Sequence, residues 1–506
     1  MRAVWASLMG LALLATTGAA PTPAVAGGTL RIGTQEDPDR LDPAYGGTLG
    51  GRFVFTALCD KLWDLTPELG FKPQLATKWS WSPDGRALDI TLRDDVTFHD
   101  GEKMTAAAVA FNLERYRTLP DGARRGEMRS VSAVEVTGPN TVRLVLSQPF
   151  IPLLAALSDR AGMMASPKAI ERLGKDFFTA PVCSGPFQFT ERVAQDRIVL
   201  DRYPGYRDRA AINFDRVVIR PTPNSTLRLV NLQAGQLDII QDMSPTDTAK
   251  VRADGKLKLS IVTGLGHAGV YFNIANGPAA DNPFGRDKRV RAALEAAIDR
   301  NVINQVVMDG LFGPTNQTES PKSPFYNPQR PLPARDVARA RALLAEAGVV
   351  KPVLELRVQN APRDQQVAEV IQAMAAEAGI EVRVAVGEAN SNVDAMNRGA
   401  FTAHINNWSG RADPDANISI FLGPESVQNW AKYTNPAFTA ALERGRAETD
   451  PAKRIAAYHD IAAIYTEDRP MLFLYNTTWL FAHSAALKGF VPVPDGLIRV
   501  QGMSLD

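Results

Sequence analysis

Residues 400–422 read AFTAHINNWSGRADPDANISIFL, and the rest of the chain can be interpreted outward from this stretch. An apolar, strand-like run at 401–405 leads into Trp408. A loop rich in glycine, proline and charged residues follows, and a second apolar run at 418–422 closes the stretch. Binding sites are commonly built in this way, because a loop after a strand presents side chains that a rigid scaffold positions.

Three side chains of this loop could form a site. Trp408 offers an apolar wall, whereas Arg411 and Asp413 can fix the orientation of a charged ligand. The alternative is a solvated loop in which Trp408 covers a core, and Asp413 and Asp415 form turns or cap a helix. The rest of the chain favours binding.

The composition is that of an ordinary globular protein. The chain has 506 residues, of which 45% are hydrophobic and 22% charged, and Lys plus Arg number 56 against 55 for Asp plus Glu. At about 100–200 residues per domain, this length predicts two or three domains. The balanced charge, without a basic block, argues against nucleic acid as the main partner. We expect a monomer.

Residues 1–26 have the features of a secretory signal peptide. Arg2 gives a short positive region, residues 4–15 are apolar, and residues 24–26 form an A-x-A cleavage site. The alternative is a buried N-terminal helix; the apolar run is too short to span a bilayer comfortably. We expect an exported, soluble chain that begins near Gly27.

Cys59 and Cys183 are the two cysteines of the chain. In an oxidising compartment they can pair, and in the chain-entropy model a bridge over so long a loop contributes about 5 kcal/mol to stability. The alternative is two buried free thiols. Because the chain is expected to be exported, we favour the disulfide.

Strand and helix signals alternate along the first half of the chain. Residues 28–33 predict a strand, and WSWSPDGRALDITL (79–92) predicts a hairpin, because Pro-Asp-Gly separates two alternating segments. Thr105 is placed to cap a helix, and residues 130–146 predict two more strands. This alternation of elements implies an α/β fold class.

The character of the sequence changes near Gly264. Residues 287–308 carry apolar side chains at helical spacing and predict one long helix. Residues 354–358, 365–378 and 380–384 predict a strand, a helix and a strand. Such units favour a second α/β lobe with a partly parallel sheet.

The sequence does not support any of the common motifs of catalysis or cofactor binding. The sequence GLGHAG (264–269) matches GxGxxG, but the VYFN that follows predicts a strand, and no helix N-terminus is there to hold a pyrophosphate. GxSxG, HExxH, CxxC and P-loop patterns are absent, and the five histidines lack metal-ligand spacing. We therefore expect no catalytic residues, cofactor or metal. A secreted two-lobe hydrolase or transferase is the alternative.

At this point the residues resemble a known family, the bacterial extracellular solute-binding proteins of family 5, which serve ABC importers of peptides, nickel, opines and related solutes. The likeness covers essentially all of the mature chain. Its matching blocks are WSWSPDGRALDITLRDDVTFHDGEKMTAAAVAFNLER (79–115), PVCSGPFQF (181–189), GQLDII (235–240), VYFNIANGPAADNPFGRDKRVRAALEAAIDR (270–300), AAEAGIEVRV (375–384) and WSGRADPDAN (408–417).

The resemblance implies a two-lobe periplasmic-binding-protein fold of type II, with a hinge and an extra subdomain. Lobe I would comprise 27–263 and the return at 478–506, with the subdomain near 46–180, and lobe II would comprise 264–477. The protein would be periplasmic, would not be an enzyme, and would deliver a small organic solute or short peptide to the transmembrane subunits of an ABC permease. Cys59 and Cys183 would then staple lobe I without locking the hinge.

The resemblance also implies binding residues. In peptide-binding relatives a Trp of this block lines the pocket, and an Asp three positions later pairs with the peptide's α-ammonium; here the Trp is Trp408 and the third position is Arg411. Arg411 suits a carboxylate or phosphate, so we expect a peptide-like or acidic solute. If Arg411 pairs instead with Asp413 or Asp415, it is a loop brace.

Weaker predictions concern residues at positions where relatives contact solute or cross between lobes. For each of them the alternative is packing or turn formation. They are Asn360, Tyr45, Gly46, Thr48, Tyr271 and Asn273.

Overall fold

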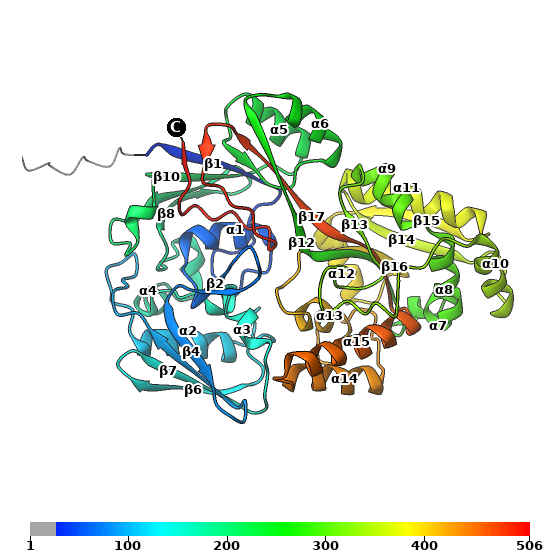
Figure 1. Ribbon diagram of the computed structural model, residues 1–506, viewed down its shortest axis with the longest axis horizontal. Helices are drawn as coiled ribbons and strands as arrows, with labels where there is room; N and C mark the ends of the chain where they lie inside the picture. The colour runs from blue at the N-terminus through cyan, green and yellow to red at the C-terminus, as the bar shows by residue number, and fades with distance from the viewer. Residues whose placement is uncertain (1–26, 506) are drawn as a thin grey trace, which may run out of the picture.

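The computed structural model describes residues 27–505, so the predicted signal peptide lies outside the described residues. Within this range the largest sheet has eleven strands, ten of them in the order β15-β14-β16-β12-β17-β11-β1-β10-β9-β8, while β13 pairs with β17 (Figure 1). These strands are β1 (Thr29–Thr34), β8 (Phe187–Val193), β9 (Arg197–Arg202), β10 (Arg216–Pro221), β11 (Ile239–Ile240), β12 (Leu257–Phe272), β13 (Gly313–Pro314), β14 (Val353–Gln359), β15 (Glu381–Gly387), β16 (Ala403–Trp408) and β17 (Met471–Ser484).

Two long antiparallel strands, β12 and β17, join two bodies of the molecule (Figure 1). We call the elements before β12, together with the chain after β17, the N-terminal body, and the elements between β12 and β17 the C-terminal body. The pairing of β12 with β17 is irregular between Thr263 and His267, and Thr263 lies opposite Thr478. The lobe boundaries proposed at 263/264 and 477/478 fall at this irregularity.

The N-terminal body contains a separate antiparallel sheet in the order β4 (Ala76–Trp81), β5 (Ala87–Leu92), β7 (Thr141–Leu146) and β6 (Val131–Gly138). The predicted hairpin is confirmed as β4 and β5. Thr105 caps the helix that packs on this sheet, accepting a hydrogen bond from the Ala108 N–H, as the sequence predicts. Short strands β2 (Trp63–Leu65), β3 (Phe71–Pro73), β18 (Leu487–Lys488) and β19 (Ser504–Leu505) complete this body.

Helices surround both bodies, and none of those in residues 27–505 is long and apolar enough to cross a membrane. The N-terminal body carries α1 (Leu49–Leu58), α2 (Ala106–Thr118), α3 (Leu153–Ala156), α4 (Pro167–Leu173), α5 (Ser225–Gln233) and α6 (Thr248–Ala253). The C-terminal body carries α7 (Pro283–Arg286), α8 (Lys288–Ala297), α9 (Arg300–Met308), α10 (Val337–Glu346), α11 (Pro362–Glu377), α12 (Ala389–Asn397), α13 (Asp415–Leu422), α14 (Pro436–Ala447) and α15 (Pro451–Asp468).

The single helix predicted over 287–308 is wrong, because the structure divides it into α8 and α9. The backbone at Ile298 and Asp299 is extended. Asp299 then caps α9 by accepting hydrogen bonds from the N–H groups of Asn301 and Val302. The strand, helix and strand predicted over 354–384 are confirmed as β14, α11 and β15, and β14 and β15 are parallel, as predicted.

Cys59 and Cys183 form a disulfide with a Cα–Cα distance of 4.9 Å across a sequence separation of 124. Both residues are buried in the core of the N-terminal body. Cys59 is the C-cap of α1, so the bridge fixes the end of that helix. The other end of α1 carries Arg52, a residue of the site described below.

Candidate functional site

The loop from Trp408 to Asp415 is pinned against the strands that join the two bodies. A Cβ on Gly410, which has a φ of 83°, would lie 2.2 Å from the carbonyl carbon of Leu265. A Cβ on Gly266 would lie 1.8 Å from the carbonyl oxygen of Trp408. Gly266 of the rejected nucleotide motif and Gly410 of the loop therefore serve close backbone packing between β12 and this loop.

Asn417, on α13, fixes the loop through hydrogen bonds of its side-chain amide. Its Oδ1 accepts hydrogen bonds from Trp408 Nε1 at 3.0 Å and from the Arg411 N–H at 2.8 Å. Its Nδ2 donates to the Arg411 carbonyl at 3.1 Å and to Glu319 Oε1 at 2.9 Å. The Trp408 ring packs edge-on against Phe421, and the Arg411 guanidinium lies 4.5 Å from the centre of the Trp408 ring.

The acids of the loop are already paired within the C-terminal body. Asp413 Oδ1 accepts a hydrogen bond from Arg454 at 2.7 Å, and Asp415 Oδ1 accepts one from Arg446 at 2.6 Å. Both carboxylates are buried. The structure therefore does not show the brace considered above, in which Arg411 pairs with Asp413 or Asp415.

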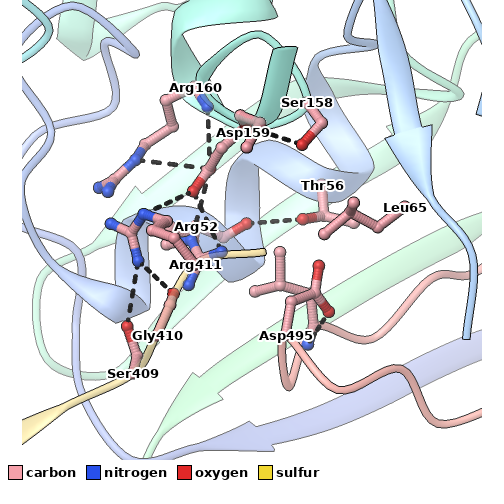
Figure 2. A network of polar contacts seen from close by, with 12 residues as sticks. Arg52, Thr56, Leu65, Ser158, Asp159, Arg160, Ser409, Gly410, Arg411 and Asp495 are labelled. Atoms are coloured by element: carbon pink, nitrogen blue, oxygen red, sulfur yellow. Dashed lines mark hydrogen bonds and ion pairs between the residues drawn. The ribbon is translucent and has the colours of Figure 1, made fainter. Parts of the chain in front are cut away.

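Arg411 instead reaches across to the N-terminal body. Its Nε lies 3.4 Å from Oδ2 of Asp159, and its Nη1 donates to the Gly410 carbonyl at 2.7 Å (Figure 2). Asp159 follows α3 and caps the short 3-10 helix Arg160–Gly162. This contact thus joins the predicted binding loop to the region proposed as the extra subdomain.

Asp159 pairs with two arginines of the N-terminal body and with Arg411 of the loop. Arg52 Nη2 is 3.1 Å from Asp159 Oδ2, and Arg160 Nε is 3.7 Å from Asp159 Oδ1 (Figure 2). Arg124 contributes a fourth guanidinium, which pairs with Glu127 and lies close enough to Arg160 and Arg411 to repel both. We call Arg52, Arg124, Arg160, Arg411 and Asp159 the arginine cluster.

The electrostatics of the arginine cluster are unbalanced. Burial alone would raise the pKa of Asp159, but Arg52, Arg160 and Arg411 hold it well below its usual range. Burial, reinforced by repulsion from Arg52, lowers the pKa of Arg411 to about 10. Within 4.0 Å, the four guanidinium groups pair with two carboxylates, those of Asp159 and Glu127. Two further carboxylates lie close enough to interact with the cluster, Asp495 with Arg52 and Glu36 with Arg160.

Asp159 Oδ2 is buried without a hydrogen-bond partner among the described residues, and so are several donors of the cluster. They are Arg52 Nη1, Arg124 Nε and Arg160 Nε, and the three side chains belong to residues that are 3%, 4% and 1% exposed. Buried donors in folded proteins are normally hydrogen-bonded. The arrangement can therefore bind an anion that supplies acceptors and negative charge together.

The predicted loop of Tyr45, Gly46 and Thr48 meets the cluster through its main chain. Arg160 Nη1 donates to the Gly46 carbonyl at 2.9 Å and to the Thr48 carbonyl at 3.3 Å. Thr48 also caps α1, the helix that carries Arg52. The Tyr45 ring instead packs beside the guanidinium groups of Arg40 and Arg115.

The other three predicted residues have no polar contact with the arginine cluster among the described residues. The Tyr271 side chain is buried, and its hydroxyl lies 3.2 Å from His267 Nε2. Asn273 is fully buried, and its amide donates to backbone carbonyls, including that of Phe401 at 2.9 Å. Asn360 is exposed and donates to Glu388 Oε1 at 2.9 Å.

No group of three or more His, Cys, Asp or Glu side chains in residues 27–505 is arranged to hold a metal ion. The arginine cluster itself was missed by sequence reasoning, except for Arg411. A signal was available in the adjacent charges Asp159 and Arg160, which follow the apolar helix α3 after Leu157 and Ser158.

The chain matches one family model and is similar over most of its length to solute-binding proteins. Residues 70–429 match the family model "Bacterial extracellular solute-binding proteins, family 5 Middle". The chain is 27% identical over 516 aligned positions to the glutathione-binding protein GsiB of Salmonella typhi, covering 97% of this chain and 96% of the relative. It is 26% identical over 469 positions to GsiB of Shigella dysenteriae serotype 1, covering 90% of each.

Solved structures share the fold across nearly the whole chain. PBP AgaA in complex with agropinic acid, from A. tumefaciens R10, has a TM-score of 0.83 and 25% identity, covering 95% of this chain and 99% of that one. The ABC transporter-associated periplasmic binding protein DppA from Helicobacter pylori, in complex with peptide STSA, has a TM-score of 0.84 and 24% identity, covering 95% and 98%.

The fold is therefore the two-lobe periplasmic-binding-protein fold that the resemblance implies. The relatives capture solutes for ABC importers and are not enzymes, which leaves the hydrolase or transferase alternative without support. With a family model that matches most of its length, this chain belongs to the bacterial extracellular solute-binding proteins of family 5.

Proposed function

We propose that this protein captures a peptide-like organic solute that carries at least one carboxylate, and delivers it to an ABC permease. The observation that supports the proposal is the arginine cluster, which has more positive than negative charge and buried N–H donors without partners. Burying an unpaired charge costs several kcal/mol, roughly, unless a counter-charge arrives. A carboxylate bound between Arg52, Arg160 and Arg411 would supply that charge.

The proposed site also explains how a solute would close the protein. Arg411 belongs to the C-terminal body, and Arg52 and Arg160 belong to the N-terminal body. An anion that binds both sets of guanidinium groups would draw the two bodies together about the β12 and β17 crossing. Such closure excludes water and strengthens each polar contact.

The relatives favour the same class of solute. Two proteins similar to this chain are named for glutathione, whose molecule has two carboxylates, and a structural neighbour was solved with agropinic acid. We propose that this protein acts in the periplasm as a monomer, after cleavage near Ala26. Lobe I would comprise 27–263 and 478–506, with its extra subdomain at 46–180, and lobe II would comprise 264–477.

The proposal is tested by isothermal titration calorimetry with S-methylglutathione, in which a methylated sulfur prevents exchange with the Cys59–Cys183 disulfide. The matched ligand is its dimethyl ester, which lacks both carboxylates. We expect the acid to bind at least about tenfold more tightly than the ester, since a charge-assisted hydrogen bond is worth about 1.5–3 kcal/mol. Equal binding of acid and ester would contradict the proposal.

A further inference from the structure

The two bodies also touch at the C-terminal end of α14, away from the β12 and β17 crossing (Figure 1). The Ile151 N–H donates a hydrogen bond to the Arg446 carbonyl at 2.9 Å. Gln148 Nε2 donates to Glu443 Oε2 at 3.3 Å. Because each of these contacts joins a residue of one body to a residue of the other, both are broken when the bodies separate.

An ion pair between the bodies adds to this contact. The Arg129 guanidinium pairs with Glu425 and lies 4.9 Å from the centre of the Phe150 ring. Glu425 Oε1 also accepts a hydrogen bond from Arg446 Nη2 at 2.9 Å, so it connects an arginine of each body. Burial would raise the pKa of Glu425, but Arg446 and Arg129 together hold it below its ordinary value. We call the three contacts between the bodies the clasp, and its pairs are Ile151–Arg446, Gln148–Glu443 and Arg129–Glu425.

The clasp is connected to the arginine cluster on both of its sides. In the N-terminal body, the short helix α3 lies between Ile151 and Asp159. In the C-terminal body, Arg446 Nε donates to Asp415 Oδ1 at 2.6 Å, and Asp415 belongs to the same loop as Arg411. An anion that draws Arg411 toward the N-terminal body would therefore bring the two halves of the clasp together.

We propose that the clasp holds the two bodies closed around a solute, so that Arg129 and Gln148 slow the release of that solute. The inference goes beyond the proposed function, because the clasp acts on closure and not on the chemistry of the solute. Its side-chain contacts are partly exposed, and such ion pairs and hydrogen bonds are individually weak. The clasp can therefore open again for release. Its N-terminal half comes from the region proposed as the extra subdomain, which gives that region a role in closure.

The test uses the double variant Arg129→Met, Gln148→Ala, which removes two contacts of the clasp and leaves the acids on the other side paired with Arg446. The control is Arg143→Met, which breaks an exposed ion pair with Asp89 inside the N-terminal body. Hydrogen exchange of the Ile151 amide, read by mass spectrometry with and without S-methylglutathione, reports opening of the clasp directly. Neither variant changes the residue before Ile151, so the intrinsic exchange rate of that amide stays the same.

We expect the Ile151 amide to exchange about 3- to 20-fold faster in the double variant than in the wild type and the control. Amides of α2 should exchange equally in all three proteins, which separates opening of the clasp from unfolding of the subdomain. Stopped-flow measurement should show S-methylglutathione leaving the double variant faster by a similar factor.

Equal exchange of the Ile151 amide in all three proteins would overturn the clasp. So would exchange at the rate of an unstructured chain in the wild type, with and without S-methylglutathione, because the clasp would then not form. Faster exchange with an unchanged release rate would overturn the role of Arg129 and Gln148 in release. The exchange measurement needs no solute, so failure of S-methylglutathione to bind would contradict the proposed function and leave the clasp to be decided by Ile151.

Discussion

Two sets of buried arginines and aspartates meet at the binding loop, and they differ in charge balance. In the C-terminal body, Asp413 pairs with Arg454, and Asp415 with Arg446, which also pairs with Glu425 and Glu443. At the boundary with the N-terminal body, Asp159 faces Arg52, Arg160 and Arg411, and buried N–H donors are left over. In the C-terminal set each buried aspartate has its own arginine, whereas we propose that the arginine cluster takes an anion from the solute.

The largest loss of stability is expected when an ion pair of the C-terminal body is broken. Arg446→Met would leave the buried Asp415 carboxylate without its cation, so the free energy of unfolding should fall by about 3–5 kcal/mol. Arg444→Met is the control on the same helix, because Arg444 makes an exposed ion pair with Asp460 that is worth about 0–1 kcal/mol. Denaturant unfolding measures both. Equal stability of the two variants would show that the Asp415–Arg446 pair is not structural.

The Cys59–Cys183 disulfide tests whether the N-terminal body can lose stability without losing binding. Replacing both Cys59 and Cys183 by Ser should lower the free energy of unfolding by about 2–5 kcal/mol. Affinity should change less than stability, because the bridge lies within one body and leaves the β12 and β17 crossing free. Thermal unfolding and calorimetry measure the two quantities. Loss of binding in a variant that still folds would contradict this separation.

Removing an arginine from the arginine cluster should weaken solute binding and leave the free energy of unfolding almost unchanged. Arg411→Met removes one of four like charges, so unfolding should change by about 1 kcal/mol or less, while S-methylglutathione affinity falls about 10- to 100-fold. Arg398→Met is the control, because Arg398 pairs only with the exposed Asp394 among the described residues. A large stability loss with unchanged affinity in Arg411→Met would make this arginine structural.

Glu319 gives a smaller, pH-dependent effect. Burial raises the pKa of Glu319 to about 7 from an ordinary value of about 4.3, so between these values the folded protein holds a proton that the unfolded chain has released. Stability without solute therefore falls as pH rises from about 4.3 to 7. Glu319→Gln removes this loss. The difference in the free energy of unfolding between Glu319→Gln and the wild type should therefore be about 1–3 kcal/mol larger, in favour of the variant, at pH 8 than at pH 4. Parallel curves for the two proteins would contradict the raised pKa.

Sequence reasoning predicted much of the fold because its signals are local. The hairpin at 79–92 and the Thr105 cap depend on neighbouring residues, and both were confirmed. The single helix at 287–308 was wrong because the cap at Asp299 outweighs the apolar spacing that continues past it. The family blocks supplied the two-lobe architecture, which local patterns alone could not.

The site was predicted only in part, because its partners come from distant segments. Trp408 and Arg411 were singled out from one loop, but Asp159 lies 252 positions before Arg411 (411 − 159), and no local pattern joins them. Asp413 was predicted as a ligand contact, and its pairing with Arg454 across the C-terminal body was not visible in the sequence. Charge balance can be judged only after folding has brought the partners together.

Native mass spectrometry of the protein purified from its own periplasm tests the central claim most directly. The measurement compares the wild type with the Arg52→Met, Arg411→Met double variant. We predict a co-purifying solute that carries at least one carboxylate and is lost from the double variant. A neutral solute, or any solute that both proteins retain equally, would contradict the claim that the unbalanced arginines are the binding site.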